Sequence, residues 1–290
     1  MTHPPLPSLE RARPGTRSAG EAPRRFVLCA DDFGMAPGVN AALLELAARG
    51  RVTALSCLVG APAWREGAAA LVRGGVAVEA GLHLTFGDEH PLAVVWRAAR
   101  GRAGLLDASR LEASIGAQLD AFADAVGRPP AYVDGHLHVH QLPGVREALL
   151  RVLRARFGRD LPWVRNTVPL RRRGAKAAFI AALGGRALRD ALRAGGIRHN
   201  ADFAGVYDFS PRADYRALVR GWLADVADGG LLLCHPIFPG GTPVAPDAEA
   251  RLAEARYLGS EAFVADCRAA GAVAGPADAV LPPAAAADRA

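Results

Sequence analysis

Short apolar segments alternate with amphipathic segments along most of the chain, and this alternation constrains the fold more than any other feature. The apolar segments have the length of buried strands, and the segments between them carry helical patterns. Strands separated by helices of about 10 to 15 residues predict a parallel sheet with crossovers, in an α/β barrel or a doubly wound sheet. The strands we expect are 26–30, 52–59, 76–84, 131–140, 163–164, 204–206 and 231–236, and the helices are 38–48, 64–73, 111–126, 145–156, 175–194 and 214–227.

The chain length favours a single catalytic domain. A chain of 290 residues accommodates one α/β barrel of about 250 residues, so we predict one barrel-like domain with a mostly parallel sheet at 25–275. Residues 1–24 are rich in Pro, Arg and Ser and lack the apolar core of a secretory signal, which predicts a disordered leader. Residues 276–290 are predicted to be a flexible tail. No apolar run of about 18 residues indicates a membrane span.

Charge and cysteine usage narrow the class of partner and the compartment. The formal net charge is +6, Lys176 is the only lysine, and the arginines are dispersed apart from 171–173. A nucleic-acid binder usually carries a basic stripe with interleaved aromatic residues, so no nucleic-acid partner is expected. The four cysteines have no CxxC spacing, which predicts free thiols and a cytoplasmic location. A monomer and a homodimer are both compatible with the sequence.

Polar residues follow the predicted strands where each strand ends. Asp31 and Asp32 come directly after strand 26–30, His83 lies near the end of strand 76–84, and His235 ends the last strand. Adjacent carboxylates repel each other and are rarely buried without a partner, so we expect a cation beside them. Because the C-terminal strand ends of an α/β barrel converge on its active site, these residues should meet there.

The segment VDGHLHVHQLP is the densest polar signal. If the segment stays extended, Asp134, His136, His138 and His140 all point to one face, because strand side chains alternate. A lone histidine is more often structural, but four polar groups in this register predict a metal or catalytic site. Since a strand advances by about 3.3 Å per residue, one or two of the four coordinate, and the others orient the ligands or bind substrate.

The motif order carries a resemblance to a known family. Between about residues 25 and 270 the chain contains, in this order, ADDFG, RGRVTALSCLVGAPA, GLHL, VDGHLHVHQLP and CHP. In this combination it resembles the YdjC-like carbohydrate deacetylases, which include chitooligosaccharide deacetylases and hopanoid-biosynthesis-associated deacetylases. The resemblance implies a barrel-like α/β fold, a divalent metal and hydrolysis of the N-acetyl group of an N-acetylglucosamine-containing saccharide or glycolipid.

The resemblance also implies roles for individual residues. Asp32, His83 and His136 correspond to the metal ligands, and Asp31 corresponds to the general base. The chain departs from the family pattern at Gly135, where a serine is often found, and in the order His-Leu-His at 136–138, but neither change removes a ligand. One Asp and two His suit zinc or magnesium, with manganese, cobalt and nickel as alternatives.

Further residues are candidates for the remaining roles. His235 is the candidate acid for the departing amine, and its alternative is a structural histidine before a turn-forming proline. Arg165 is expected to hold Asp31 or the substrate, or else to be an ordinary surface arginine. Asp134, His138 and His140 are assigned to the substrate or to orienting the ligands.

Other interpretations stay open. An amidohydrolase or phosphoesterase on a similar barrel would use the HxH at 136–138 but usually adds a lysine or further histidines at later strand ends, whereas Lys176 lies in a helical stretch. A non-catalytic sugar-binding protein would not need Asp31 beside Asp32. A lipid-linked substrate would require an apolar shelf, and the loop at 238–250 is a candidate cover for the site. The shelf candidates are Trp163, Phe203, Phe238, Pro239 and Val244.

Overall fold

Seven parallel strands form the centre of the protein in the spatial order β5-β4-β3-β2-β1-β7-β6, and β8 pairs with the start of β1. The computed structural model describes residues 22–86, 107–239 and 247–283. Every strand pairing in these ranges is parallel, which confirms the predicted α/β class. The strands are β1 (Arg24–Phe33), β2 (Ala54–Cys57), β3 (Glu79–Leu84), β4 (Tyr132–Gly135), β5 (Trp163–Val164), β6 (Phe203–Ala204), β7 (Gly230–Cys234) and β8 (Ala272–Ala274).

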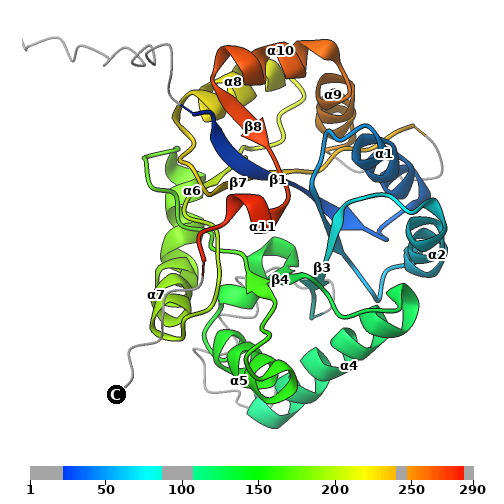
Figure 1. Ribbon diagram of the computed structural model, residues 1–290, viewed down its shortest axis with the longest axis vertical. Coiled ribbons are helices and arrows are strands. Elements are labelled where there is room, and N and C mark those ends of the chain that lie inside the picture. Colours follow the sequence, from blue (N-terminus) through cyan, green and yellow to red (C-terminus); the bar gives the residue numbers. More distant parts are fainter. Residues whose placement is uncertain (1–21, 87–106, 240–246, 284–290) are drawn as a thin grey trace, which may run out of the picture.

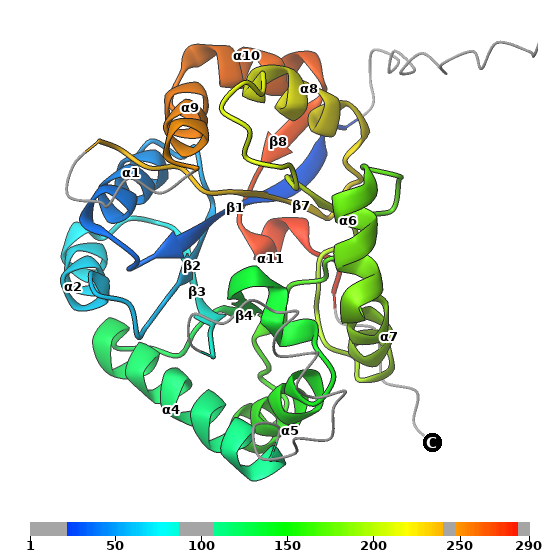
Figure 2. The ribbon, with the colours of Figure 1, turned by 180° about the vertical axis from the view of Figure 1, so that it is seen from behind.

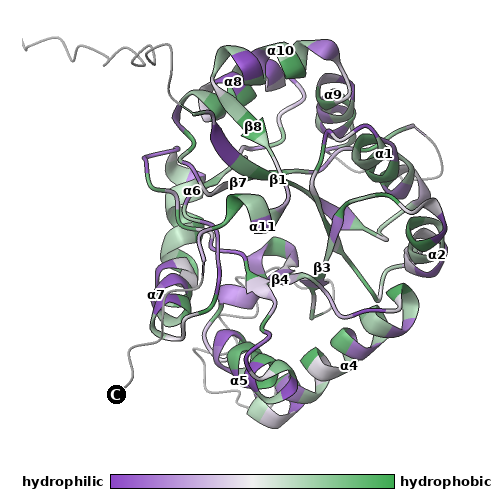
Figure 3. Cartoon of the chain, in the orientation of Figure 1, coloured by the Kyte–Doolittle hydropathy of each residue, from purple (hydrophilic) through white to green (hydrophobic). Residues whose placement is uncertain are grey.

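Helices surround the strands on the outside of the ring, as both views of the ribbon show (Figures 1 and 2). In Figure 3 the strands are mostly hydrophobic, whereas helices such as α4 and α5 carry both colours, as expected for helices with one buried face. No helix in the described ranges has the length and apolarity needed to cross a membrane. The helical elements are α1 (Pro37–Ala48), α2 (Trp64–Gly74), α4 (Ala108–Val126), η2 (His136–Gln141), α5 (Val145–Phe157), α6 (Ala175–Ile180), η3 (Ala181–Gly185), α7 (Arg186–Ala194), α8 (Tyr215–Asp225), α9 (Ala248–Leu258), α10 (Glu261–Ala269) and α11 (Ala277–Val280).

The two ends of the strand order are bridged by hydrogen bonds from the end of β5 and the residues after it to residues that precede β6. The Val164 N–H donates to the Arg198 carbonyl at 3.0 Å. The Asn166 N–H donates to the Asn200 Oδ1 at 2.7 Å, and the Asn200 amide donates back to the Asn166 carbonyl at 2.8 Å. These bonds satisfy backbone groups that have no partner strand at the ends of the two-residue strands β5 and β6. They also close the ring between these two strands.

The interior of the ring is a separate apolar core, closed at one end by α11, which crosses the centre of the ring in Figure 1. Because side chains alternate along a strand, every second strand residue points inward. The inward-facing members are Val27, Cys29, Ala54, Tyr132, Trp163, Phe203, Leu231 and Leu233, and they pack with Ala277, Val280 and Leu281.

The predicted domain boundaries need correction at both ends. Residues 277–281 of the predicted tail are packed against the barrel, because Ala277, Val280 and Leu281 are buried in its interior. At the other end Arg24 belongs to β1, and its guanidinium donates to the carbonyls of Val226 (2.7 Å) and Ala270 (2.8 Å). The rest of the predicted leader and tail, 1–21 and 284–290, lies outside the described residues.

A stacked aromatic pair fills the middle of the barrel interior. The rings of Tyr132 and Trp163 lie 4.1 Å apart between centroids, at an interplanar angle of 15°. On the neighbouring strand, a Cβ added at Gly81 would lie 2.5 Å from atoms of the Tyr132 ring. Only a residue without a side chain therefore leaves room for the tyrosine on β4.

We expect Gly81→Ala to lower the free energy of unfolding by about 1–3 kcal/mol, because the added methyl group must displace the Tyr132 ring. Chemical denaturation measures the loss. Gly221→Ala is the matched control: Gly221 lies inside α8, and a methyl group added there would have no neighbour within 4 Å, so that variant should gain about 0.5–1 kcal/mol. Equal stability of Gly81→Ala and the unmodified protein would contradict this account of the interior.

Candidate functional site

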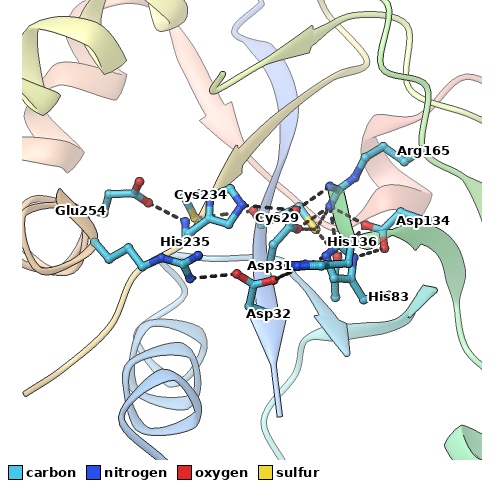
Figure 4. Close-up of polar contacts among 12 residues, drawn as sticks. Cys29, Asp31, Asp32, His83, Asp134, His136, Arg165, Cys234, His235 and Glu254 are labelled. Atoms are coloured by element: carbon cyan, nitrogen blue, oxygen red, sulfur yellow. Dashed lines mark hydrogen bonds and ion pairs between the residues drawn. The ribbon is translucent and has the colours of Figure 1, made fainter. Parts of the chain in front are cut away.

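A layer of polar side chains lies directly above the apolar interior. On each contributing strand a polar residue follows the last inward-facing residue at a spacing of two, so it points into the same barrel. Figure 4 shows these side chains converging from different strands, as expected for the C-terminal strand ends of an α/β barrel. The pairs are Cys29 and Asp31, Ala54 and Ser56, Gly81 and His83, Tyr132 and Asp134, Trp163 and Arg165, and Leu233 and His235.

A β-bulge places both adjacent carboxylates in the site. Ala30 pairs with Leu55 and Phe33 pairs with Cys57, so β1 advances three residues while β2 advances two. Within the bulge Asp32 has a φ of 71°, a left-handed conformation that Asp tolerates better than most residues. Asp31 and Asp32 are 2% and 1% exposed, and both line one cavity. A regular strand would have pointed them to opposite faces.

Asp32, His83 and His136 form a cluster that can hold a metal ion. The Asp32 Oδ1 lies 3.0 Å from the His136 Nδ1 and 3.6 Å from the His83 Nε2, and the three donor atoms all lie within 4.8 Å of one another. Ligand bonds of about 2.0–2.2 Å to a single ion place neighbouring donor atoms about 3 to 3.5 Å apart. The spacing and the oxygen and nitrogen donors therefore fit one divalent cation.

Asp134 orients His83 from the side away from Asp32. The Asp134 Oδ1 lies 2.6 Å from the His83 Nδ1, and the Ser56 hydroxyl donates to the Asp134 Oδ2 at 2.7 Å. Burial alone would lower the pKa of His83, but the carboxylate of Asp134, together with those of Asp31 and Asp32, raises that pKa above its usual value. A carboxylate behind a ligand histidine is the usual way that proteins fix the ring of a metal ligand.

Arg165 is fully buried beneath the cluster, which excludes the alternative of a surface arginine. Its Nη1 and Nη2 donate to the two oxygens of Asp31 at 2.7 and 2.6 Å, and Nη2 also lies 2.5 Å from the Asp134 Oδ2. Burial would raise the pKa of Asp31, but the guanidinium holds this pKa well below its usual range. Cys29, Asp31 and Asp134 form a second cluster with the spacing of metal ligands. The Arg165 guanidinium contacts all three residues and supplies the positive charge of this cluster.

His235 faces Asp31 from the opposite side, with its Nε2 3.9 Å from the Asp31 Oδ2. Its backbone N–H donates to the Glu254 Oε2 at 2.5 Å, and the Tyr207 hydroxyl donates to the other oxygen of Glu254 at 2.7 Å. Burial lowers the pKa of His235 to about 4 and raises the pKa of Glu254 to about 7. Glu254 therefore ties α9 to the end of β7.

The predicted strand 131–140 is wrong beyond Gly135. β4 ends there, and residues 136–141 form the tight turn η2, in which Leu137 and His138 have φ values of 49° and 62°. The chain folds back so closely that a Cβ at position 135 would lie 2.8 Å from the His140 backbone nitrogen. A side chain at position 135 would therefore collide with the turn, and glycine avoids this collision.

The turn separates residues that were expected to share one face. His136 enters the metal cluster, whereas His138 lines the cavity with its ring 5.8 Å from Phe203. His140 is fully buried, and its Nε2 lies 3.0 Å from the Arg165 carbonyl oxygen. Burial lowers the pKa of His138 and brings the pKa of His140 to about 4, which favours neutral rings.

Three residues of the site were not assigned to it from the sequence. They are Arg251 and Glu254 on α9, and Tyr207 after β6. Arg251 donates from Nη1 to the Asp32 Oδ2 at 2.8 Å. Asp247, Arg251 and Glu254 are spaced four and three residues apart, which places them on one face of a helix. That spacing was the available signal, but no helix was predicted at 248–258.

A cavity of about 370 Å³ opens above the cluster. Leu137 and Phe179 lie on its lining and are 47% and 51% exposed. Trp163 and Phe203, expected as an apolar shelf at the barrel mouth, lie instead in the barrel interior. Residues 240–246 of the loop expected to cover the site, including Val244, lie outside the described residues. The apolar part of the lining consists of Leu137, Phe179, Ile180, Leu183, Val206, Phe209 and Leu233.

In the part of the chain that the structure describes, a parallel α/β barrel carries an Asp-His-His cluster at its strand ends. This arrangement defines the class of the protein as an α/β barrel with a candidate metal centre. The chain belongs to the YdjC-like family, whose family model, described as YdjC-like protein, matches residues 25–269.

Individual relatives agree with this assignment. A carbohydrate deacetylase of Homo sapiens is 31% identical over 275 residues, 81% of this chain and 84% of the relative. A chitooligosaccharide deacetylase of Yersinia enterocolitica is 30% identical over 132 residues, 41% of this chain and 52% of the relative. The chain thus spans about half the length of that bacterial relative. A crystal structure from Enterococcus faecalis, of a protein provisionally assigned to cellobiose-phosphate cleavage, has the same fold. Its TM-score is 0.64 at 19% identity, over 89% of this chain and 99% of that one.

Removal of Arg165 should strongly destabilise the protein. Arg165→Met leaves Asp31 and Asp134 buried without their counter-charge, so we expect the free energy of unfolding to fall by about 3–5 kcal/mol. Urea denaturation of the metal-free protein measures this loss. The exposed Arg268 on α10 provides a control, because Arg268→Met should stay within about 0.5 kcal/mol. If both variants were equally stable, the buried ion pairs would contribute little.

Glu254 should make stability depend on pH between about 4.5 and 7. Its pKa is raised from 4.5 to about 7 in the folded protein, so the folded state binds a proton that the unfolded state releases. The resulting stability is present below pH 4.5 and is lost as pH rises through 7, a change of about 3 kcal/mol. Glu254→Gln removes this dependence. Relative to the unmodified protein, the free energy of unfolding of the variant should therefore rise by about 3 kcal/mol between pH 4.5 and a pH above 7.

Denaturation series at pH 4.5 and 8 on metal-free protein test this shift. Glu249→Gln, at an exposed position on the same helix, provides the control and should follow the unmodified protein at both pH values. A pH-independent difference between Glu254→Gln and the unmodified protein would show that Glu254 does not change its protonation state in this range.

Proposed function

We propose that the protein is a metal-dependent hydrolase that removes the N-acetyl group from an N-acetylglucosamine-containing saccharide or glycolipid. The observation that carries the proposal is the placement of Asp31 beside the Asp32, His83 and His136 cluster in one cavity. The relatives named as carbohydrate and chitooligosaccharide deacetylases support the same reaction class. The cytoplasmic location and the choice between monomer and homodimer stay predictions.

Asp32, His83 and His136 are the proposed ligands of one divalent ion. One carboxylate oxygen and two imidazole nitrogens suit zinc, and magnesium, manganese, cobalt or nickel are compatible when waters complete the coordination. When bound, such an ion polarises an amide carbonyl and raises the acidity of water beside it. Asp134 is assigned to fixing the His83 ring, through the 2.6 Å contact to Nδ1.

The roles of the remaining residues follow from their contacts. Asp31 is proposed to take the proton of the attacking water, and its bidentate pairing with Arg165 keeps it ionised and fixed in direction. Because this pairing also lowers the basicity of Asp31, the proton transfer would require the increased acidity that a bound ion would give to the water. His235, with its Nε2 3.9 Å from the Asp31 Oδ2, is proposed to protonate the departing amine. Because burial lowers its pKa to about 4, the ring must first take up the proton that Asp31 removes from the water. His138 and His140 are assigned to the cavity wall and to the support of Arg165.

The cavity lining favours a substrate with an apolar portion. Leu137 and Phe179 stay about half exposed at its edge, with Ile180 and Leu183 beside them. Leucine, isoleucine and phenylalanine side chains offer no hydrogen bonds to sugar hydroxyls, whereas they gain from burial against an apolar group. A glycolipid is therefore the favoured substrate branch, and a plain oligosaccharide is the alternative.

Acetate release from metal-loaded protein tests the proposed function. The panel contains N-acetylglucosamine, its β-linked di- and trisaccharides and an N-acetylglucosaminyl glycolipid, and acetate should appear together with an equal amount of free amine. Release from the glycolipid alone would favour that branch. Metal binding without acetate from any member would favour the phosphoesterase or sugar-binding alternative.

Two variants separate metal binding from chemistry in the same assay. Asp31→Asn keeps the shape of the side chain but removes the base, so kcat should fall by about a hundredfold or more while metal content is unchanged. His83→Ala should lose both the metal and the activity. Full metal occupancy in His83→Ala, measured by elemental analysis, would exclude the proposed ligand set.

A further inference from the structure

The two oxygens of Asp32 face different partners. Oδ1 is the oxygen that lies 3.0 Å from the His136 Nδ1 and 3.6 Å from the His83 Nε2, inside the metal cluster. Oδ2 accepts a hydrogen bond from the Arg251 Nη1 at 2.8 Å. One oxygen of the carboxylate therefore faces the two histidines of the cluster, and the other is bonded to the Arg251 guanidinium.

Arg251 is itself held in place. Its Nε donates to the Asp247 Oδ2 at 2.7 Å, one helical turn earlier, and its guanidinium carbon lies 5.8 Å from the centre of the Phe209 ring. The side chain is only 13% exposed. A guanidinium fixed by a carboxylate and an aromatic ring keeps its remaining N–H groups in a defined direction.

Phe209 links this arginine to the rest of the site. It has a φ of 57°, a left-handed conformation that is unusual for a bulky residue, and its ring centre lies 5.0 Å from that of His235. Strained backbone of this kind persists only where the surroundings impose it, and it concentrates at functional sites. Arg251 therefore lies in the same cavity wall as Phe209 and His235.

We propose that Arg251 is a positioning residue that restricts Asp32 to a single ligating oxygen. The inference rests on the metal site of the proposed function. With Oδ2 bound to Arg251, only Oδ1 is available to the ion, and the other coordination positions stay open for water and for a substrate carbonyl. Without Arg251 the carboxylate can present both oxygens, because carboxylates bind metals through one or two oxygens.

The number of exchangeable waters on bound Mn²⁺ distinguishes this role from simple charge balance. Mn²⁺ prefers octahedral oxygen and nitrogen coordination, so a second oxygen from Asp32 displaces a water. In Arg251→Met we expect about one fewer exchangeable water, measured as lower water-proton relaxivity of the Mn²⁺-loaded protein. We also expect kcat to fall by roughly tenfold or more, in line with other residues that orient metal ligands.

Three variants complete the design. Arg256→Met removes an exposed arginine from the same helix and should leave both the relaxivity and kcat unchanged. Arg251→Lys retains one donor for Oδ2 and should restore the water count. Asp247→Ala frees the Arg251 Nε and should produce a smaller change in the same direction, which provides the test if Arg251→Met does not fold.

An unchanged relaxivity in Arg251→Met and in Asp247→Ala, with Mn²⁺ bound, would overturn the proposal. Loss of the Arg251→Lys rescue would do the same, because a single donor to Oδ2 would then be insufficient. Failure of the proposed function is a separate result: the unmodified protein would bind Mn²⁺ without releasing acetate, and the water count would still be measurable.

Discussion

The candidate site depends on one buried cation, the Arg165 guanidinium. Asp31 and Asp134 are almost completely shielded from water, and two such charges persist in a core only when a counter-charge and hydrogen bonds compensate the lost hydration. Asp134 can then hold His83, and Asp31 can face His235 across the cavity. The turn that supplies His136 also supplies His140, which bonds to the Arg165 carbonyl. The candidate ligands His83 and His136, the proposed base Asp31 and the residues that support them therefore form one connected unit.

The fold class and the location of much of the candidate site could be predicted because both follow from the periodicity of apolar and polar residues within each strand and helix. Alternating strands and helices permit few arrangements, and parallel strands bring their C-terminal ends together. The positions of Asp134, Arg165 and His235 extend the inward-facing rows that begin with Tyr132, Trp163 and Leu233. The two-residue period of a strand therefore predicts correctly which side chains point into the barrel, as long as the chain stays extended.

The errors occur where the local pattern stops determining the conformation. The backbone leaves the extended region at Leu137 and His138, and nothing in HLHVH indicates two consecutive left-handed residues. The burial of α11 depends on an opening in the barrel that strands far away in the chain create. The contact of Arg251 with Asp32 joins residues 219 positions apart. Such partners are set by the tertiary fold, and a single sequence contains no local sign of them.

The bulge in β1 has a consequence for how such a site can arise or be lost. Between its two pairing points with β2, the strand carries one residue more than its neighbour, and that surplus lies within the Asp31-Asp32 pair. Deleting one of the two aspartates would equalise the residue counts and leave a regular parallel ladder. The pairing of residues 26–30 with β7 precedes the bulge and would not be interrupted. Loss of a single codon would therefore give a barrel with a more regular sheet that lacks one of the two carboxylates of the candidate site. In this chain, the presence of both carboxylates at the site depends on one inserted residue.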